Sequence, residues 1–282
     1  MPSLAPPAPP QSLVDADVRR ALAEDIGPGD ATADLIDAGA RAQARIVCRE
    51  PAVIAGIPWA QACFLELDRD ARIEWMHADG DRVAAESVLC TIAGDARALV
   101  GAERCALNFL QTLSGTATVT RRYVDAVAGT RATILDTRKT LPGLRQAQKY
   151  AVRCGGGANH RIGLYDAILI KENHVAAAGG IARAVAAARA RHPDLLLEIE
   201  VESIAELREA LDAGVDRVLL DDFDMPTLRE AVAVTAGSVP LEVSGSVDLE
   251  RVRAIAECGV DYISIGALTK HVHAVDLSMR FA

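Results

Sequence analysis

The feature that most constrains the fold is a series of short apolar runs in the part of the chain that follows Thr116. The runs are 133–136, 167–171, 196–200, 217–221, 241–244 and 262–266. From the second run on, each lies about one strand, one helix and two loops after the one before it, which is typical of strands that alternate with helices. Crossovers of that length join parallel strands. The pattern predicts an α/β array of about six parallel strands, either an incomplete barrel or an open doubly wound sheet.

The residues before this array follow a different pattern. Apolar residues at helical spacing predict a helix over 13–26, which Gly27-Pro28-Gly29 would end. Strand-like runs follow, interrupted by a helical stretch over 58–67; the runs are 44–48, 52–55, 73–76 and 88–92. We therefore expect a separate N-terminal α+β domain, preceded by a proline-rich, disordered leader of residues 1–12.

Charge and composition exclude several classes of partner. A formal net charge of −9 argues against nucleic acid, whose phosphates require a basic surface. We expect no membrane association, because no apolar run approaches the ~18 residues of a membrane span and the N-terminus does not resemble a signal peptide. The six cysteines are scattered without a Cys-x-x-Cys pair, which favours reduced thiols in the cytoplasm.

Polar or small residues close the apolar runs of the parallel array. They are Asp136, Lys171, Glu200, Asp221, Ser244 and Gly266. Because the carboxyl ends of parallel strands meet at one face, these residues are expected to line one pocket. Taken singly, each charge is equally typical of a solvated strand end. Glu200 and Asp221 are more informative together, since carboxylates after apolar strands are costly to bury without a cation or a metal.

Basic residues gather in one stretch of this acidic chain, around three successive glycines at 155–157. They are Arg138, Lys139, Arg145, Lys149, His160, Arg161 and Lys171. Glycines let a backbone approach a ligand, although such a run is equally typical of a flexible loop. The concentration of charge favours a polyanion site. The segment 244–246, before a helix predicted to begin near Val247, suggests a phosphate cradle with Gly266 as a second wall, although small residues also serve as ordinary N-caps.

Two stretches, 135–174 (LDTRKTLPGLRQAQKYAVRCGGGANHRIGLYDAILIKENH) and 104–118 (RCALNFLQTLSGTAT), resemble one family. They are similar to the quinolinate phosphoribosyltransferases, also called nicotinate-nucleotide pyrophosphorylases (carboxylating), and the likeness runs from Glu24 to His271. A match of this length is far more specific than a short motif. The resemblance implies transfer of phosphoribose from 5-phosphoribosyl 1-pyrophosphate to quinolinate with decarboxylation. The products are nicotinate mononucleotide, pyrophosphate and CO2, in NAD biosynthesis.

The resemblance also implies an architecture. It divides the chain into an N-terminal α/β sandwich domain over 13–115, an incomplete α/β barrel over 116–267, and a C-terminal segment over 268–282 that packs back on the first domain. It further implies a homodimer in which each active site contains groups from both subunits.

Individual site residues follow from the resemblance by position. The quinolinate-binding residues would be Arg104 of the partner chain, Arg138, His160, Arg161 and Lys171. The phosphate-binding residues would be Lys139, Ser244, Gly245, Ser246, Gly266 and Lys270. Lys139, Lys171, Glu200 and Asp221 would be catalytic, and the last two would hold Mg²⁺ directly or through water. Ser246 departs from the family pattern, which has glycine there in many relatives.

Four alternatives remain at this point. A nicotinate phosphoribosyltransferase would need to bind only one carboxylate, and a relative could act on another small anion. Lys171 could instead form a Schiff base with a carbonyl substrate, as in aldolases. A carrier protein is suggested by the hairpin-like segment 79–92, but the lysine that such a carrier modifies is missing, since no lysine precedes Lys139.

Overall fold

The computed structural model describes residues 6–281 and divides them into two compact units. The first unit takes in 6–121, 141–156 and 271–281, and the second takes in 122–140 and 157–270. The leader prediction falls partly on residues 1–5, which lie outside the described residues. Among the described helices, none combines the length and the apolar character required to cross a bilayer.

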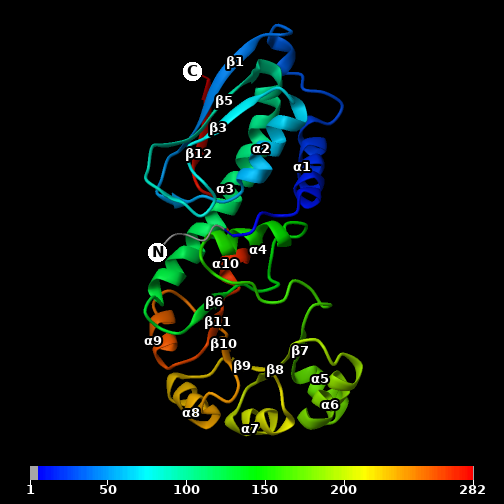
Figure 1. Cartoon of the computed structure of the whole chain (residues 1–282), viewed down its shortest axis with the longest axis vertical. Helices are drawn as coiled ribbons and strands as arrows, with labels where there is room; N and C mark the ends of the chain where they lie inside the picture. Colours follow the sequence, from blue (N-terminus) through cyan, green and yellow to red (C-terminus); the bar gives the residue numbers. More distant parts are fainter. Residues whose placement is uncertain (1–5, 282) are drawn as a thin grey trace. The chain divides into compact units, whose positions relative to one another are not determined.

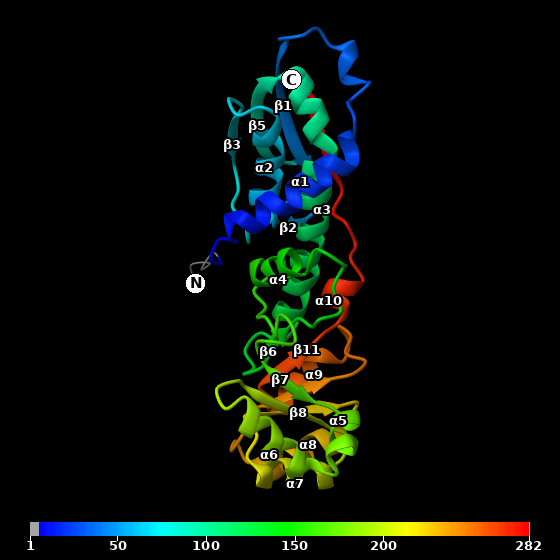
Figure 2. The same ribbon diagram turned by 90° about the vertical axis from the view of Figure 1, so that its right-hand side faces the viewer.

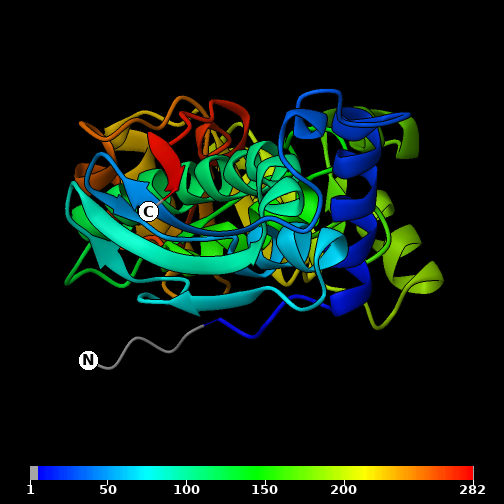
Figure 3. The same ribbon diagram turned by 90° about the horizontal axis from the view of Figure 1, so that it is seen from above.

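The first unit is built around an antiparallel sheet of order β12-β1-β5-β3 (Figure 3). Its elements are α1 (Gln11–Ile26), η1 (Ala33–Leu35), β1 (Arg41–Cys48), β2 (Ala52–Val53), α2 (Ile57–Leu67), β3 (Arg72–Trp75), β4 (Arg82–Val83), β5 (Ser87–Asp95), α3 (Ala96–Ala126, whose last residues belong to the second unit), α4 (Arg145–Cys154) and β12 (Leu277–Phe281). Apolar side chains of the sheet and of α1, α2 and α3 form one buried cluster. The predicted α+β character of this region is confirmed.

Two hydrogen bonds join polar side chains inside this core. The Trp59 indole N–H donates to Asp17 Oδ2 at 3.0 Å, and the Tyr150 hydroxyl donates to Asp79 Oδ2 at 2.7 Å. Both pairs join elements that are distant in sequence, so they fix how α1, α2 and α4 pack within the first unit.

The second unit is the parallel array, with strand order β6-β11-β10-β9-β8-β7 and every pairing parallel. Its elements are β6 (Thr133–Leu135), β7 (Ile168–Ile170), α5 (Glu172–Ala178), α6 (Ile181–Arg191), β8 (Leu197–Val201), α7 (Ile204–Ala213), β9 (Arg217–Asp221), α8 (Met225–Thr235), β10 (Leu241–Ser244), α9 (Val252–Glu257), β11 (Tyr262–Ser264) and α10 (Ala267–Lys270). The sheet is curved, and α5 to α9 lie along its convex side (Figures 1 and 2). Strands β7 to β11 follow one another in chain order, β6 pairs with β11, and the helices lie on one side, so this is an incomplete barrel and not a doubly wound sheet.

Strand alternation decides which side chains share the concave face of this barrel. Glu198 is paired in register with Arg217, and Leu219 is paired with both Glu200 and Glu242. Because side chains alternate along a strand, Glu198 and Glu200 of β8 lie on the same face.

The helix expected near Val247 starts later than predicted, since the first residue of α9 is Val252. A turn precedes it, in which the Asp248 side chain accepts the backbone N–H groups of Glu250 (3.1 Å) and Arg251 (2.8 Å) and the Val252 N–H donates to the Asp248 carbonyl at 3.0 Å. These are the contacts of an N-cap residue, so Asp248 starts this turn. The segment 244–246 lies before the turn and contributes no residue to it.

Candidate active site

A cavity of about 250 Å³ lies at the carboxyl edge of the parallel sheet, inside the second unit. Its lining residues come from the six strands, from the loops that follow them and from the segment between α4 and β7. They are Thr137, Arg138, Lys139, His160, Arg161, Leu169, Lys171, Glu200, Leu219, Glu242, Ser244 and Ser264. Four of them are lysines or arginines. The strand ends therefore bring together cations that are far apart in the sequence.

A second cavity, of about 280 Å³, lies in the first unit. Its charged lining residues are Asp17, Glu24 and Asp25, with Arg20 as the cation. Carboxylates outnumber cations there, so this cavity does not suit a polyanion, although it is slightly the larger of the two.

Arg138 and Arg161 form a pair of neighbouring guanidinium groups in the site. Burial, followed by the charge of Arg138, lowers the pKa of Arg161 from its ordinary value. The Arg161 Nη1 also donates to the carbonyl of Ala167 at 3.4 Å, which orients the side chain. Two like charges held together in a partly buried site repel each other until an anion lies between them. This arrangement matches a ligand with carboxylate groups, to which arginine can donate two hydrogen bonds at once.

Asp136 at the end of β6 places Arg161 near Arg138. This carboxylate is fully buried and accepts the His160 backbone N–H at 2.9 Å and the Asn159 Nδ2 at 2.6 Å. Ala158 forms a parallel bridge with Leu135 next to it. The segment 158–160, which leads into Arg161, is therefore held by hydrogen bonds beside β6, the edge strand that precedes Arg138.

Lys171 and Glu200 form an ion pair across the ends of β7 and β8. The Glu200 side chain is 9% exposed and that of Lys171 is 43% exposed. The pair supplies the nearly buried carboxylate with the cation that its position requires.

Gly266 leaves room for Lys139. A Cβ atom at Gly266 would lie 2.9 Å from Lys139 Cδ, which is closer than two carbon atoms can approach without displacement. The backbone of Lys139 is fixed on both sides, because its N–H donates to Thr137 Oγ1 at 3.1 Å and its carbonyl accepts the Thr269 hydroxyl at 2.8 Å. Any larger residue at position 266 would therefore move the lysine stem.

The loop after β10 is tightly constrained. Gly245 has a φ of 94°, and a Cβ atom there would lie 3.0 Å from the backbone nitrogen of Asp222. Ser246 has a φ of 43°, so the serine adopts the left-handed conformation that a glycine adopts without strain. Arg251 Nη1 donates to the Ser246 carbonyl at 3.2 Å. Such strained residues concentrate at functional sites.

Six of the predicted site residues do not line the cavity. Asp221 ends β9, opposite Ser244 in register, and Lys270 ends α10. Gly245, Ser246 and Gly266 belong to the strand-end loops of the same unit. Arg104 lies on α3 of the first unit and is exposed.

Two parts of the predicted polyanion site belong to the first unit and not to the unit that contains the cavity. Arg145 and Lys149 lie on α4. A Cβ atom at Gly155 would lie 2.6 Å from the Ala117 carbonyl oxygen, so this glycine allows α4 and α3 to pack closely. The first of the three glycines thus has a packing role.

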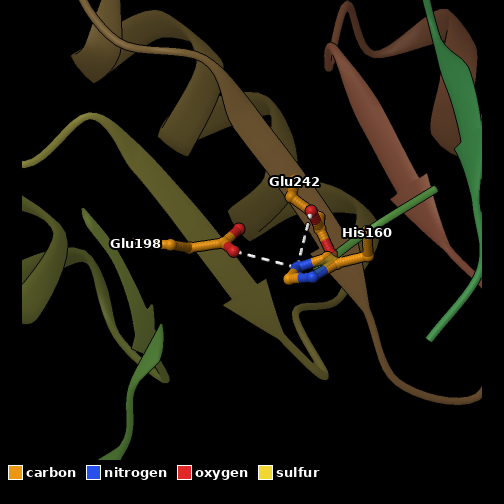
Figure 4. A group of neighbouring side chains, drawn as sticks. All are labelled: His160, Glu198 and Glu242. Atoms are coloured by element: carbon orange, nitrogen blue, oxygen red, sulfur yellow. Dashed lines mark ion pairs between the residues drawn. The ribbon is translucent and has the colours of Figure 1, made fainter. Parts of the chain in front are cut away.

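A cluster of buried charge at the wall of the cavity was not predicted from the sequence. It consists of Glu198, Glu242 and the predicted His160, which Figure 4 shows together, and of Arg217, which pairs with Glu242. Burial above all raises the pKa of Glu198 and of Glu242 to about 7, and each is also raised by a neighbouring carboxylate. Arg217 Nη1 donates to Glu242 Oε2 at 3.3 Å and its guanidinium stacks on the Tyr262 ring at 4.2 Å.

Comparison with known proteins matches both halves of the chain to one family. Residues 30–114 match the model of the quinolinate phosphoribosyl transferase N-terminal domain, and residues 116–280 match that of the C-terminal domain. The chain belongs to the quinolinate phosphoribosyltransferase family.

Individual members of the quinolinate phosphoribosyltransferase family resemble the chain over almost its full length. The nicotinate-nucleotide pyrophosphorylase (carboxylating) of Mycobacterium leprae is 44% identical, covering 93% of this chain and 95% of the relative. The quinolinate phosphoribosyltransferase (decarboxylating) 1 of Nicotiana glauca is 39% identical, covering 98% of this chain and 84% of the relative. The solved nicotinate-nucleotide pyrophosphorylase of Francisella tularensis shares the fold with a TM-score of 0.95 and 45% identity, covering 98% of both chains.

In this quinolinate phosphoribosyltransferase family member, strand alternation is the signal that could have found the buried acids. Glu198 lies two residues before the predicted Glu200, and Glu242 lies two residues before the predicted Ser244. A period of two places each pair on one face of its strand. The contact with His160 joins residues far apart in sequence and has no local signal.

Proposed function

We propose that this chain transfers phosphoribose from 5-phosphoribosyl 1-pyrophosphate to quinolinate with decarboxylation, which yields nicotinate mononucleotide, pyrophosphate and CO2. It is a glycosyltransferase of NAD biosynthesis. One observation carries the proposal within the structure: Arg138, Lys139, Arg161 and Lys171 line one cavity of an otherwise acidic protein. The match of both domains to the family gives that cavity its substrate.

Quinolinate carries two carboxylates on neighbouring ring carbons. Arg138 and Arg161 bind them, since a guanidinium can offer two parallel N–H donors to a planar carboxylate. Lys171 adds a third cation, and Arg104 of a partner subunit adds a fourth in a homodimer with shared active sites. A nicotinate phosphoribosyltransferase has one carboxylate to bind, so the adjacent guanidinium pair favours the dicarboxylate.

The phosphoribosyl donor occupies the other strand ends. Lys139 lies between the two substrates, while Lys270 and the loops at 244–246 and Gly266 bind phosphate through backbone N–H groups and the lysine charge. The fixed Lys139 backbone and the space left by Gly266 support this assignment.

The donor set at the ends of β8 and β9 fits Mg²⁺, because Glu200 and Asp221 offer the hard carboxylate oxygens that this ion prefers, with substrate phosphates and water completing its shell. Mg²⁺ supplies charge neutralisation for the pyrophosphate. Glu200 has a second role in the absence of substrate, as the ion-pair partner of Lys171.

The reaction requires positioning and charge compensation from the protein. The bond from the ribose to the pyrophosphate breaks, the leaving group takes the electron pair, and the pyridine nitrogen forms the new bond to the same carbon. Carboxylates of Glu200 and Asp221 stabilise the positive charge that develops on the ribose. The carboxylate next to the alkylated nitrogen then leaves as CO2, and the electron pair of the broken bond stays on the ring carbon, where the positive charge of the neighbouring nitrogen stabilises it. A proton from water then forms the C–H bond of nicotinate mononucleotide at that carbon. Arginines hold the substrate so that both reacting atoms are aligned.

Schiff-base chemistry at Lys171 is disfavoured by the structure. A lysine nucleophile has to lose its proton, which burial among apolar groups or nearby cations promotes. Lys171 instead pairs with Glu200, which stabilises the ammonium. Six free thiols among the described residues agree with a cytoplasmic enzyme, which we infer as its location.

Substrate discrimination tests the proposal. Purified protein is supplied with Mg²⁺, the phosphoribosyl donor and either quinolinate or nicotinate, and nicotinate mononucleotide is quantified by chromatography. We expect product from quinolinate and little or none from nicotinate. Equal use of nicotinate would contradict the assignment of a dicarboxylate site.

A further inference from the structure

Strands β6 and β11 leave the parallel sheet next to each other, and the segments that follow them stay in contact. The strands pair in register, with Ser264 opposite Leu135. One residue further, the Ile265 N–H donates to the Leu135 carbonyl at 3.0 Å. Lys139 lies on the segment after β6, and Thr269 lies on α10, which follows β11. The two segments therefore run together at the carboxyl edge of the sheet.

The Thr269 hydroxyl makes a contact that a helical threonine does not usually make. Threonine in a helix commonly bonds to the carbonyl three or four residues before it. Thr269 instead donates to the carbonyl of Lys139 at 2.8 Å, across 130 positions of the chain. Thr269 is also fully buried. The bond thus forms away from water, where loss of the donor leaves a carbonyl without compensation from solvent.

Lys139 is held at the cavity wall by its backbone and by its stem. The lysine is exposed and lines the cavity. Its N–H donates to Thr137 Oγ1 at 3.1 Å, and its carbonyl accepts the Thr269 hydroxyl. Its stem lies against Gly266, where a Cβ atom would come within 2.9 Å of Lys139 Cδ. Ordering a lysine side chain costs rotamer entropy, and a backbone that is already fixed lowers the cost left for ligand binding.

We propose that Thr269 is a positioning residue that acts through Lys139. Its hydroxyl attaches the Lys139 backbone to α10 and so limits the positions that the lysine ammonium can reach. Lys270, the next residue of α10, is the second lysine assigned to phosphate. One buried hydroxyl therefore sets the two cations in a fixed relation, while Thr269 itself touches no substrate. The identity of the ligand rests on the proposed function.

The charge of the two lysines gives this attachment its effect. Two ammonium groups that bind the same ribose phosphate repel each other before the phosphate arrives. Flexible lysines would respond by separating, and the ligand would have to bring them together again. The hydrogen bond from α10 to the Lys139 carbonyl resists that separation at the backbone. Its removal should therefore weaken phosphate binding by about the worth of one buried hydrogen bond, roughly 5- to 10-fold in Kd.

A purely structural role is the competing interpretation, in which the hydroxyl only stabilises the edge between β6 and β11. Thr235 provides a matched control for this role. It is another buried threonine of the second unit, on α8, and its hydroxyl has no hydrogen-bond partner among the residues that the structure describes. Thr235→Val therefore removes a buried hydroxyl while leaving the contacts of Lys139 in place.

A double-mutant cycle tests whether Thr269 acts through Lys139. The Kd of nicotinate mononucleotide, which carries the ribose phosphate and undergoes no transfer alone, is measured by calorimetry on the full-length protein. Thr269→Val should raise this Kd about 5- to 10-fold in the wild-type background. It should change Kd by no more than about twofold in the Lys139→Met background. An unchanged Kd in Thr269→Val, or equal increases in both backgrounds, would overturn the proposal.

Thr269→Ser separates the hydroxyl from the rest of the side chain. It keeps the donor, so its Kd should lie within about twofold of wild type, as should that of Thr235→Val. A Thr269→Ser variant that melts like wild type and yet binds as weakly as Thr269→Val would contradict the role given to the hydroxyl.

Carbon NMR tests the contact without any ligand. The chain has four lysines, so protein labelled with ¹³C at its lysine carbonyls gives four resonances. The Lys139 resonance, identified by its loss in Lys139→Met, should move in Thr269→Val and stay near its place in Thr269→Ser and Thr235→Val. An unmoved resonance in Thr269→Val would show that the bond does not form in solution and would overturn the proposal. If wild type binds no nicotinate mononucleotide, the proposed function fails, while this resonance still decides whether Thr269 holds Lys139.

Discussion

The buried acid pair makes a specific prediction about pH and stability, tested by Glu242→Gln. Glu242 is fully buried, and burial together with the charge of Glu198 raises its pKa to about 7. The folded state therefore holds a proton that the unfolded state releases near its ordinary pKa of 4.5. Stability from this proton is fully present below about pH 4.5 and is lost as the pH rises through about 7.

The size of the effect follows from the same values. Between about pH 6 and pH 8, one such group costs the folded state about 1 kcal/mol. Because Glu198 also has a pKa of about 7 and is coupled to Glu242, the wild-type pair should lose between about 1 and 3 kcal/mol over this range. Glutamine has a similar shape and cannot titrate. Relative to wild type, Glu242→Gln should therefore gain about 1 kcal/mol between pH 6 and pH 8.

Urea denaturation followed by circular dichroism at pH 6, 7 and 8 measures this difference. Glu230→Gln is the matched control, since it makes the same chemical change at an exposed position of α8. The control should run parallel to wild type at every pH. If Glu242→Gln also ran parallel to wild type, the buried pair would not hold the proton that the structure assigns to it.

Three further predictions concern the reaction. Arg138→Ala should lower kcat/KM for quinolinate by an amount that corresponds to ~2–5 kcal/mol of lost stabilisation, because it removes a charge-assisted contact from a partly buried carboxylate. Near wild-type steady-state kinetics would remove Arg138 from the substrate site. Glu200→Gln and Asp221→Asn should each lower kcat, measured by steady-state kinetics, and leave the quinolinate Kd, measured by calorimetry, close to wild type. Unchanged turnover in both variants would refute the role of these carboxylates at the ribose. Arg104→Ala and Lys171→Ala chains, each inactive alone, should recover up to about a quarter of wild-type activity when mixed, through dimers with one intact shared site. Confirmed mixed dimers without activity would show that Arg104 does not act across subunits.

The parallel array was predictable because its signal is local. Apolar runs at 217–221 and 241–244 coincide with β9 and β10, and the charged residues that close the runs mark the edge where the cavity lies. Strand alternation then decides which of these side chains face inward. Since the pattern depends on each strand and its adjoining helix alone, a single sequence was enough to give the six strands and their direction.

Other parts of the site depend on contacts between distant residues. Glu198 and Glu242 were not predicted as site residues because a carboxylate inside an apolar strand depends on its partners for stability. Those partners, here Arg217 and His160, are distant in sequence. Of the three glycines at 155–157, which were expected to let the backbone approach a ligand, Gly155 instead has its space filled by α3, a contact between segments distant in sequence.

Release of labelled carbon dioxide tests the central claim most directly. Quinolinate labelled in the carboxylate next to the ring nitrogen, and separately in the neighbouring carboxylate, is incubated with the protein, Mg²⁺ and the phosphoribosyl donor. Only the carboxylate next to the alkylated nitrogen leaves its electron pair on a carbon that the positive charge stabilises directly. The first label should therefore leave as CO2 in step with nicotinate mononucleotide, and the second should remain in the product. No release of the first label, or release that does not depend on the phosphoribosyl donor, would contradict the account.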